Sequence, residues 1–482
     1  MIPTARHAAF ARLSVSFLIA ALASCGGSGY NSSSNMGPPL TPTITMSIAP
    51  TTITVGQSAT LTWSTTNASS CTASGGWSGT EATGGTQKIT PKASGSLTYT
   101  LTCTAPSGGG YAGGGGGKSS MSASLAVNAA SAFALTKLVA DTSAAGAMTT
   151  DPNLVNPWGV AFGTGPVWVA NNHSETSTLY DGAGVPQPSG AALVVNLAPG
   201  TGGVTFDPTG VIFNSTTDFV VTEGANSGAA LFIFAGEGGM IAGWAPNVDL
   251  TNAINVYADA NGAVYKAVAL ANSGTANFLY AADFHNNKVD VFDATFAKQA
   301  STATSFTFTD PSLPAGYAPF GIQAIKNGTG GAYQIYVAYA VQQGPDNHDN
   351  ANGAGLGLID IYDTNGKFVK RLASPGDALN APWGMAVAPS DFGTLSGALL
   401  VGNFGDGTIN GYDASSGVFM GAVTDHSGVP IALPGLWGIA FGNDANSQPH
   451  NTLFFAAGPN DEANGLYGRI DLGPAPTLSS VH

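Results

Sequence analysis

The sequence predicts an all-β protein in which a small β-sandwich precedes a six-bladed β-propeller. One motif recurs six times at intervals of about 44 to 63 residues, the period of a propeller or solenoid. Short apolar strands follow the copies, and beyond the N-terminus no segment keeps a helical 3.6-residue period over three turns. Only 9% of the 482 residues are charged, whereas 66 are glycine and 44% are hydrophobic, which is typical of exported all-β proteins.

The repeated motif marks the start of each unit in the C-terminal part of the chain. Its clear copies are 156–162 (NPWGVAF), 318–324 (APFGIQA), 381–387 (APWGMAV) and 435–441 (GLWGIAF). Two weaker copies are 202–206 (GGVTF) and 264–269 (VYKAVA). We take as equivalent Gly159, Gly203, Lys266, Gly321, Gly384 and Gly438.

Further strands complete each unit. A second apolar strand ends on a polar residue in 167–171, 219–223, 279–283 and 399–403, and a third is clearest in 288–293, 358–363 and 408–413. Three or four short strands per repeat form one propeller blade. We therefore expect the propeller over residues 132–475, with 135–140 supplying the missing strand of the last blade, and a tail at 476–482.

The N-terminal part divides into three segments. Residues 1–24 have the charge and the short apolar stretch of an export signal, too short for a comfortable membrane span. Residues 25–42 contain almost nothing to bury, which predicts a flexible tether. Residues 43–128 are Thr-rich with apolar residues in alternation, which suits a small β-sandwich.

Three cysteines are present, and two of them lie in the predicted sandwich. Export places Cys71 and Cys103 in an oxidising compartment, which favours a disulfide between them. The alternatives are two free thiols or a metal pair, for which no His or second Cys pair lies nearby.

Two local patterns resemble known bacterial segments. Residues 22–26 (LASCG) resemble a lipobox, which implies cleavage before Cys25 and acylation of its thiol; the alternative is an ordinary signal peptide with an incidental cysteine. Glycine at position 26 favours the outer membrane by the same analogy. The pattern of TLTWS at 60–64, Cys71 and YTLTC at 99–103 resembles bacterial surface Ig-like modules and identifies no ligand.

Polar residues gather where a propeller would bring its loops together. Loops that leave the second strands should emerge on the same face as the loops between blades, and Ca²⁺ or another divalent metal is a candidate ligand there. The alternative is ordinary turn chemistry. We expect at this mouth Asn171, Asn172, His173, Glu223, Asn226, Asp283, His285, Asn286, His348, Asp349, Asn403, Asp406, His426, Asn460 and Asp461. The long polar loop 342–355 is a candidate lid or ligand clamp.

Aromatic residues stand beside the repeated glycines at Trp158, Phe320, Trp383 and Trp437. We expect their rings to pack between blades near the channel. Exposed rings would instead form a stacking platform for sugars or aromatic ligands.

Composition and motifs narrow the function. A formal net charge of -14 with 14 Lys and Arg argues against nucleic acid. The chain has no G-x-S-x-G, H-E-x-x-H or P-loop pattern.

The motifs at 156–161, 348–363, 381–386, 402–407 and 435–443 resemble those of a family of uncharacterised exported bacterial β-propellers. That resemblance implies the fold but no activity. More distantly, the blades are similar to six-bladed lactonases, whose metal is held by Glu, Asn and Asp; Glu223, Asn171 and Asp283 are the matching residues.

We expect a lipid-anchored protein of the cell envelope, in the outer membrane, whose propeller binds a small molecule, a glycan or an envelope protein. The alternative is a metal-dependent hydrolase or lactonase with its site at the channel mouth. The missing catalytic motifs favour a binding module over an enzyme.

Overall fold

The computed structural model describes residues 41–473 apart from positions 56, 92, 107–115, 130, 329 and 377. Regular structure within these ranges consists of strands and single-turn 3-10 helices, so the all-β prediction is confirmed. None of the described helices has the length and apolarity that a membrane span requires. The predicted signal peptide, Cys25, nearly all of the tether and the tail at 476–482 lie outside the described residues.

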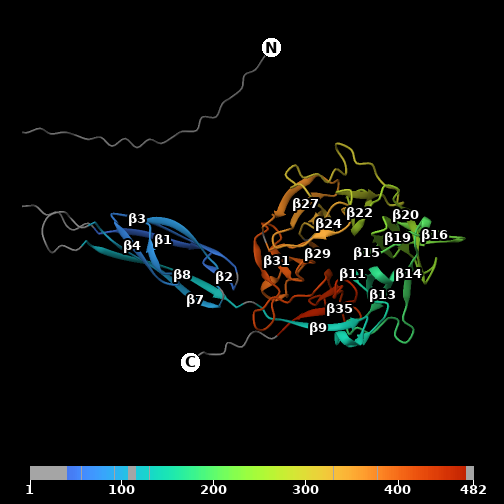
Figure 1. Ribbon diagram of the computed structural model, residues 1–482, viewed down its shortest axis with the longest axis horizontal. Coiled ribbons are helices and arrows are strands. Elements are labelled where there is room, and N and C mark those ends of the chain that lie inside the picture. Colours follow the sequence, from blue (N-terminus) through green and yellow to red (C-terminus); the bar gives the residue numbers. More distant parts are fainter. Residues whose placement is uncertain are drawn as a thin grey trace, which may run out of the picture.

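The N-terminal module consists of two sheets around one core (Figure 1). Alternating residues such as Leu61, Trp63, Tyr99 and Leu101 are buried between the sheets because successive side chains of a strand point to opposite faces. The first sheet is β1 (Thr43–Ala49), β3 (Ala59–Thr66) and β6 (Gly84–Ile89). The second is β2 (Thr52–Thr54), β8 (Lys118–Asn128), β7 (Gly95–Thr104), β4 (Ser70–Gly75) and β5 (Gly79–Glu81).

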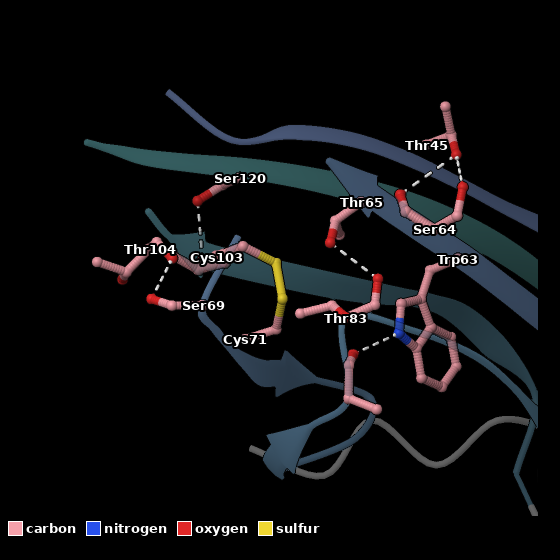
Figure 2. Close-up of a disulfide and its surroundings, with 12 residues drawn as sticks. Thr45, Trp63, Ser64, Thr65, Ser69, Cys71, Thr83, Cys103, Thr104 and Ser120 are labelled. Carbon is pink, nitrogen blue, oxygen red and sulfur yellow. Dashed lines mark hydrogen bonds between the residues drawn. A yellow bond between two sulfur atoms is a disulfide. The ribbon is translucent and has the colours of Figure 1, made fainter. Parts of the chain in front are cut away.

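The predicted disulfide between Cys71 and Cys103 is confirmed (Figure 2). Both cysteines are buried, and they stand directly opposite each other on the neighbouring strands β4 and β7. The bond therefore joins two strands of one sheet, whereas the disulfide of antibody domains joins two sheets.

The rest of the described chain forms six sheet units, here called units 1 to 6. Units 1 and 2 share a short parallel contact between their outer strands, which merges them into one eight-stranded sheet. Unit 1 is β11 (Pro157–Phe162), β12 (Val167–Asn171), β13 (Thr176–Tyr180) and β14 (Val194–Leu197); unit 2 is β15 (Pro208–Phe213), β18 (Phe232–Gly236), β19 (Met240–Trp244) and β20 (Asn252–Ala258). Unit 3 is β21 (Tyr265–Asn272), β22 (Asn277–Asp283) and β23 (Lys288–Phe292).

Units 4 to 6 follow the same order, and their strands are antiparallel except at the outermost pair of unit 6. Unit 4 is β24 (Tyr317–Lys326), β25 (Tyr333–Gln342), β27 (Leu358–Asp363) and β28 (Phe368–Ala373), with the short β26 (Asn350–Ala351) also paired to β25. Unit 5 is β29 (Pro382–Val387), β30 (Ala398–Asn403), β31 (Ile409–Asp413) and β32 (Phe419–Ala422). Unit 6 is β33 (Leu436–Phe441), β34 (Leu453–Ala457), β35 (Leu466–Leu472), β9 (Phe133–Ala140) and β10 (Thr149–Thr150).

Four 3-10 helices lie in the described loops: η1 (Ser143–Ala145), η2 (Asn172–Ser174), η3 (Thr201–Gly203) and η4 (Gly393–Leu395).

The inner strands of the six units form a closed ring. Each of β11, β15, β21, β24, β29 and β33 contacts the next, and β33 contacts β11. At the outer side of unit 6, β9 pairs with β35, so the strand expected at 135–140 does complete the last unit. Figure 1 shows β9 beside the red strands from the far end of the chain.

Glycines on the inner strands allow neighbouring units to approach closely. A Cβ on Gly438 would lie 2.3 Å from the carbonyl oxygen of Trp158, and one on Gly321 would lie 2.1 Å from that of Trp383. A side chain at either position would force the neighbouring strand to move. The contact from Gly438 to Trp158 joins the last unit to the first.

The structure corrects two positions of the repeat. The glycine of unit 2 is Gly210, because β15 pairs with β18 through the same register shift after its proline that β11 shows. The predicted Gly203 lies in η3 instead. In unit 3, Ala267 stands at the glycine position and Lys266 at that of the aromatic residue.

The strand expected at 219–223 as the second strand of unit 2 is also misplaced. Residues 220–223 form β16 (Val220–Glu223), which pairs only with β17 (Asn226–Ala229) in a two-stranded hairpin. Figure 1 shows this hairpin at the periphery of the ring. An apolar strand of the right length in the right place is therefore an insertion, and β18 is the true partner of β15.

We predict that Gly438→Ala lowers the free energy of unfolding by roughly 1 to 3 kcal/mol, because the added methyl group meets the backbone of Trp158. The matched control is Gly165→Ala, whose Cβ has no atom nearer than 4.0 Å. Urea denaturation followed by circular dichroism measures both. Equal midpoints for the two variants would contradict the close packing of β33 on β11.

Candidate functional site

Six equivalent inner-strand residues fill the centre of the ring, and we call them the central layer. All are at most 8% exposed. They are Trp158, Thr209, Lys266, Phe320, Trp383 and Trp437. Trp158 and Trp437 stack with ring centroids 3.4 Å apart, and Trp383 meets both edge-on. The expected packing of the aromatic series is confirmed, and these two stacked rings are too buried to serve as a platform for sugars.

A cavity of about 210 Å³ lies at the end of the ring where the inner strands begin, and we call it the mouth cavity. Every unit contributes to it, which gathers residues from across the chain at one place. Its lining residues are Asn156, Trp158, Asn172 and His173 of unit 1, Glu237 of unit 2, Lys266 of unit 3, His348, Asp349 and Asn350 of unit 4, Phe404 of unit 5, and Trp437 and Glu462 of unit 6.

A buried ion pair joins two units at the floor of this cavity. The ammonium of Lys266 contacts the carboxylate of Glu237, and the two side chains are only 3% and 10% exposed. Asn172 donates a hydrogen bond from Nδ2 to the other carboxylate oxygen of Glu237 at 3.0 Å. The Lys266 Nζ atom also lies 5.3 Å from the centre of the Trp158 ring. Lys266 thus stands in place of an aromatic side chain in the central layer, and Glu237 of the neighbouring unit is its counter-ion.

Glu462 brings a second carboxylate to the cavity, and this residue is half-buried. It accepts hydrogen bonds from Trp437 Nε1 at 3.1 Å and from Asn156 Nδ2 at 3.4 Å. Burial, and then the charge of Glu237, raises the pKa of the Glu462 carboxyl. Two neutral N–H groups hold this carboxylate in place.

Asn156 connects several lining residues. Its backbone φ of 46° is left-handed, a conformation that asparagine tolerates better than most residues. The Nδ2 atom lies 3.3 Å from His173 Nε2 and donates to Asn172 Oδ1 at 3.4 Å. Two buried polar atoms of lining residues, Asn156 Oδ1 and Trp158 Nε1, have no hydrogen-bond partner. The side chain of Asn156 thus holds its neighbours through Nδ2 alone.

The long loop between β25 and β27 extends across the mouth. Gln342 donates from Nε2 to the carbonyl oxygen of Phe284 at 2.6 Å, and His285 Nδ1 lies 2.8 Å from the carbonyl oxygen of Asp346. His348 lies on this loop, and its Nε2 atom is 3.8 Å from Glu237 Oε1. The loop expected as a lid or clamp therefore lines the mouth cavity.

The structure brings together only some of the residues that the sequence singled out. His173, His348, Asp349 and also Asn172 line the cavity, and His285 supports the loop above it. Glu223 is exposed on the β16–β17 hairpin, and His426 is exposed and does not line the cavity.

Asn171, Asp283 and Asn403 occupy equivalent, fully buried positions at the ends of second strands. Asn171 donates to the hydroxyl groups of Thr176 and Thr178. Asp283 accepts the backbone N–H groups of Val264 and Asn286, and Asn403 accepts that of Asn380. These side chains serve the turns of their own units.

The lactonase-like set does not converge, because Glu223 is peripheral while Asn171 and Asp283 are committed to turns. Over the described ranges, no group of three or more His, Cys, Asp and Glu side chains is arranged to hold a metal ion.

The sequence did not predict three of the charged residues as part of the cavity lining. Glu237 follows β18, whose place was given to the strand of the peripheral hairpin. Lys266 was noticed but placed at the glycine position, one residue out of register. Glu462 lies in the turn after β34, next to Asp461. Aligning the repeats on the D-P-T-G-V pattern at 207–211 would have placed Gly210 and the strand β18 of unit 2 correctly.

We predict that Glu237→Gln lowers the free energy of unfolding by roughly 3 to 5 kcal/mol, because it leaves Lys266 buried without its counter-ion. The double variant Glu237→Gln with Lys266→Met should recover most of that loss. Urea denaturation measures both. A single variant as stable as the parent chain would show that the pair is not desolvated.

Comparison with known proteins gives relatives by sequence and weak likenesses by structure. No protein-family model matches the chain. A glucose dehydrogenase structure is 12% identical with a TM-score of 0.40, covering 71% of this chain and 100% of its own. An auxiliary nutrient binding protein from Bacteroides ovatus is 11% identical with a TM-score of 0.37, covering 89% and 98%. Likenesses this weak carry no argument about function.

Two relatives are viral. The uncharacterized protein R648 of Acanthamoeba polyphaga mimivirus is 34% identical over 326 residues, covering 67% of this chain and 76% of the viral protein. The uncharacterized protein L690 of the same virus is 30% identical over 331 residues, covering 66% and 81%. The chain belongs to the same protein family as these two mimivirus proteins.

Proposed function

We propose that this is an exported, lipid-anchored protein of the cell envelope, in which a six-bladed β-propeller binds a small polar ligand at the mouth of its channel. The observation that carries the binding function is the mouth cavity, because side chains from all six units converge on it. Binding sites are concave places where a few polar groups are fixed against apolar walls. This cavity has such groups in Asn172, His173 and His348, and such a wall in Phe404.

The architecture supports this proposal. A closed ring of six inner strands, with an N-terminal strand completing the last unit, is the arrangement expected of a propeller that removes its exposed edges. Two sheets around one core support an Ig-like sandwich as the N-terminal module. We propose that this module and the tether hold the propeller away from the membrane.

The ligand we propose is small. A cavity of about 210 Å³ is below the range of roughly 300 to 1,000 Å³ that holds drug-sized molecules. Its walls offer carboxylate, imidazole and amide groups, so the ligand should carry several hydrogen-bonding groups. A small metabolite or one sugar unit of a glycan fits these limits, and nucleic acid does not suit a chain with a formal net charge of -14.

We predict that a thermal-shift screen of the mature chain against small polar metabolites finds ligands whose binding His348→Ala weakens at least tenfold. His348 lines the mouth cavity with 45% of its side chain exposed, so its loss should leave the fold intact. His426→Ala is the matched control, since His426 is exposed and does not line the cavity. Calorimetric titration measures the affinities. Ligands that both variants bind as the parent does would place the site elsewhere.

The anchor is proposed from residues 22–26 alone. We predict that the chain incorporates labelled palmitate when it is produced in a bacterial host, and that Cys25→Ser abolishes the label. The control is the double variant Cys71→Ser with Cys103→Ser, which lacks the disulfide and should keep the label. A parent chain that is exported without label would refute the anchor and leave the binding function open.

A further inference from the structure

The mouth cavity holds more negative than positive charge. Glu237, Glu462 and Asp349 line it, and Lys266 is the one lysine or arginine among the lining residues. Lys266 is paired with Glu237. Glu462 has only the two neutral N–H donors of Trp437 and Asn156. A half-buried carboxylate with no cation in direct contact attracts one.

An aromatic surface lies beside that carboxylate. Phe404 stacks on Trp437 with ring centroids 4.1 Å apart, and its side chain is only partly buried. Trp437 donates its own N–H to Glu462, so the aromatic stack and the carboxylate are in contact. Organic cations bind where an aromatic face and a negative charge meet.

Asn156 fixes the position of this carboxylate. It is 1% exposed, and its Nδ2 atom donates to Glu462. Its Oδ1 atom lies against Gly458, where an added Cβ would be only 2.2 Å away. The buried amide therefore holds Glu462 in place beside the aromatic stack.

We propose that the mouth cavity recognises a small organic cation whose ammonium group carries N–H donors. Glu462 is its counter-ion and accepts its N–H groups, Asn156 holds that carboxylate in place, and Phe404 packs against its apolar part. This inference rests on the proposed binding function and specifies its ligand class. An organic cation suits the cavity better than a divalent metal ion, because no three metal-ligating side chains converge in the described residues.

Benzylamine and benzyl alcohol provide a direct test, since they have the same shape and only the amine is charged at neutral pH. Calorimetric titration of the mature chain should show benzylamine binding at least tenfold more tightly. Glu462→Gln keeps an oxygen acceptor for Trp437 and removes the charge, so it should abolish that preference. Asp461→Asn makes the same charge change on an exposed neighbour outside the lining and should preserve the preference. A third titration with Ca²⁺ should give no heat of binding.

The comparison of the two probes on the unaltered chain does not depend on how any variant folds. Equal affinity for both probes, or binding of neither, overturns the inference. So does tight binding of Ca²⁺ that excludes benzylamine. If the metabolite screen still finds neutral ligands that depend on His348, the proposed binding function stands without a cationic ligand. If the screen also finds no ligand, both the proposed binding function and the cationic ligand are refuted.

Discussion

The ring depends on the close approach of neighbouring inner strands at positions without a side chain. Gly438 faces the backbone of Trp158, and Gly321 faces that of Trp383, at distances that leave no room for a methyl group. Because five of the six units are held against the next in this way, with Ala267 in place of glycine in unit 3, the six residues of the central layer are forced into one small volume. Their burial follows from the strand spacing. It explains why this layer is aromatic at four positions, since large flat side chains fill the space between strands.

The polar site follows from one departure from that pattern. Lys266 stands where most units place an aromatic side chain, and an ammonium group at this depth requires an opposite charge. Glu237 from the neighbouring unit supplies it. Partial burial, and then the charge of Glu237, raises the pKa of the Glu462 carboxyl. The centre of the ring thus holds a neutral ion pair, and the unequal charge of the site comes from Glu462 and Asp349, at the end where the loops of all six units meet.

The sequence predicts the ring well and the site poorly, for a physical reason. Strand closure by β9 follows from the repeat count, and the disulfide follows from the number of cysteines and the expected compartment. The register of unit 2 does not follow. Gly203 and the apolar residues 219–223 match the pattern locally, but only the pairing of β15 with β18 shows that they lie outside the sheet. Because that register was wrong, the sequence did not indicate Glu237 as a lining residue. Short apolar strands look alike in sequence, and the partner of a strand is a tertiary property.

The polar residue that ends a buried second strand is not a ligand-binding residue, because its side chain forms hydrogen bonds within its own unit. Where a strand ends at a tight turn, buried backbone N–H groups need acceptors. Asp283 and Asn403 accept them, and Asn171 is held by the hydroxyl groups of its turn. The side chains that reach the cavity come after this position, as Asn172 and His173 do in unit 1 and Phe404 does in unit 5. Polar side chains in a loop therefore first satisfy the hydrogen bonds of the turn. Only the residues that follow are available to a ligand.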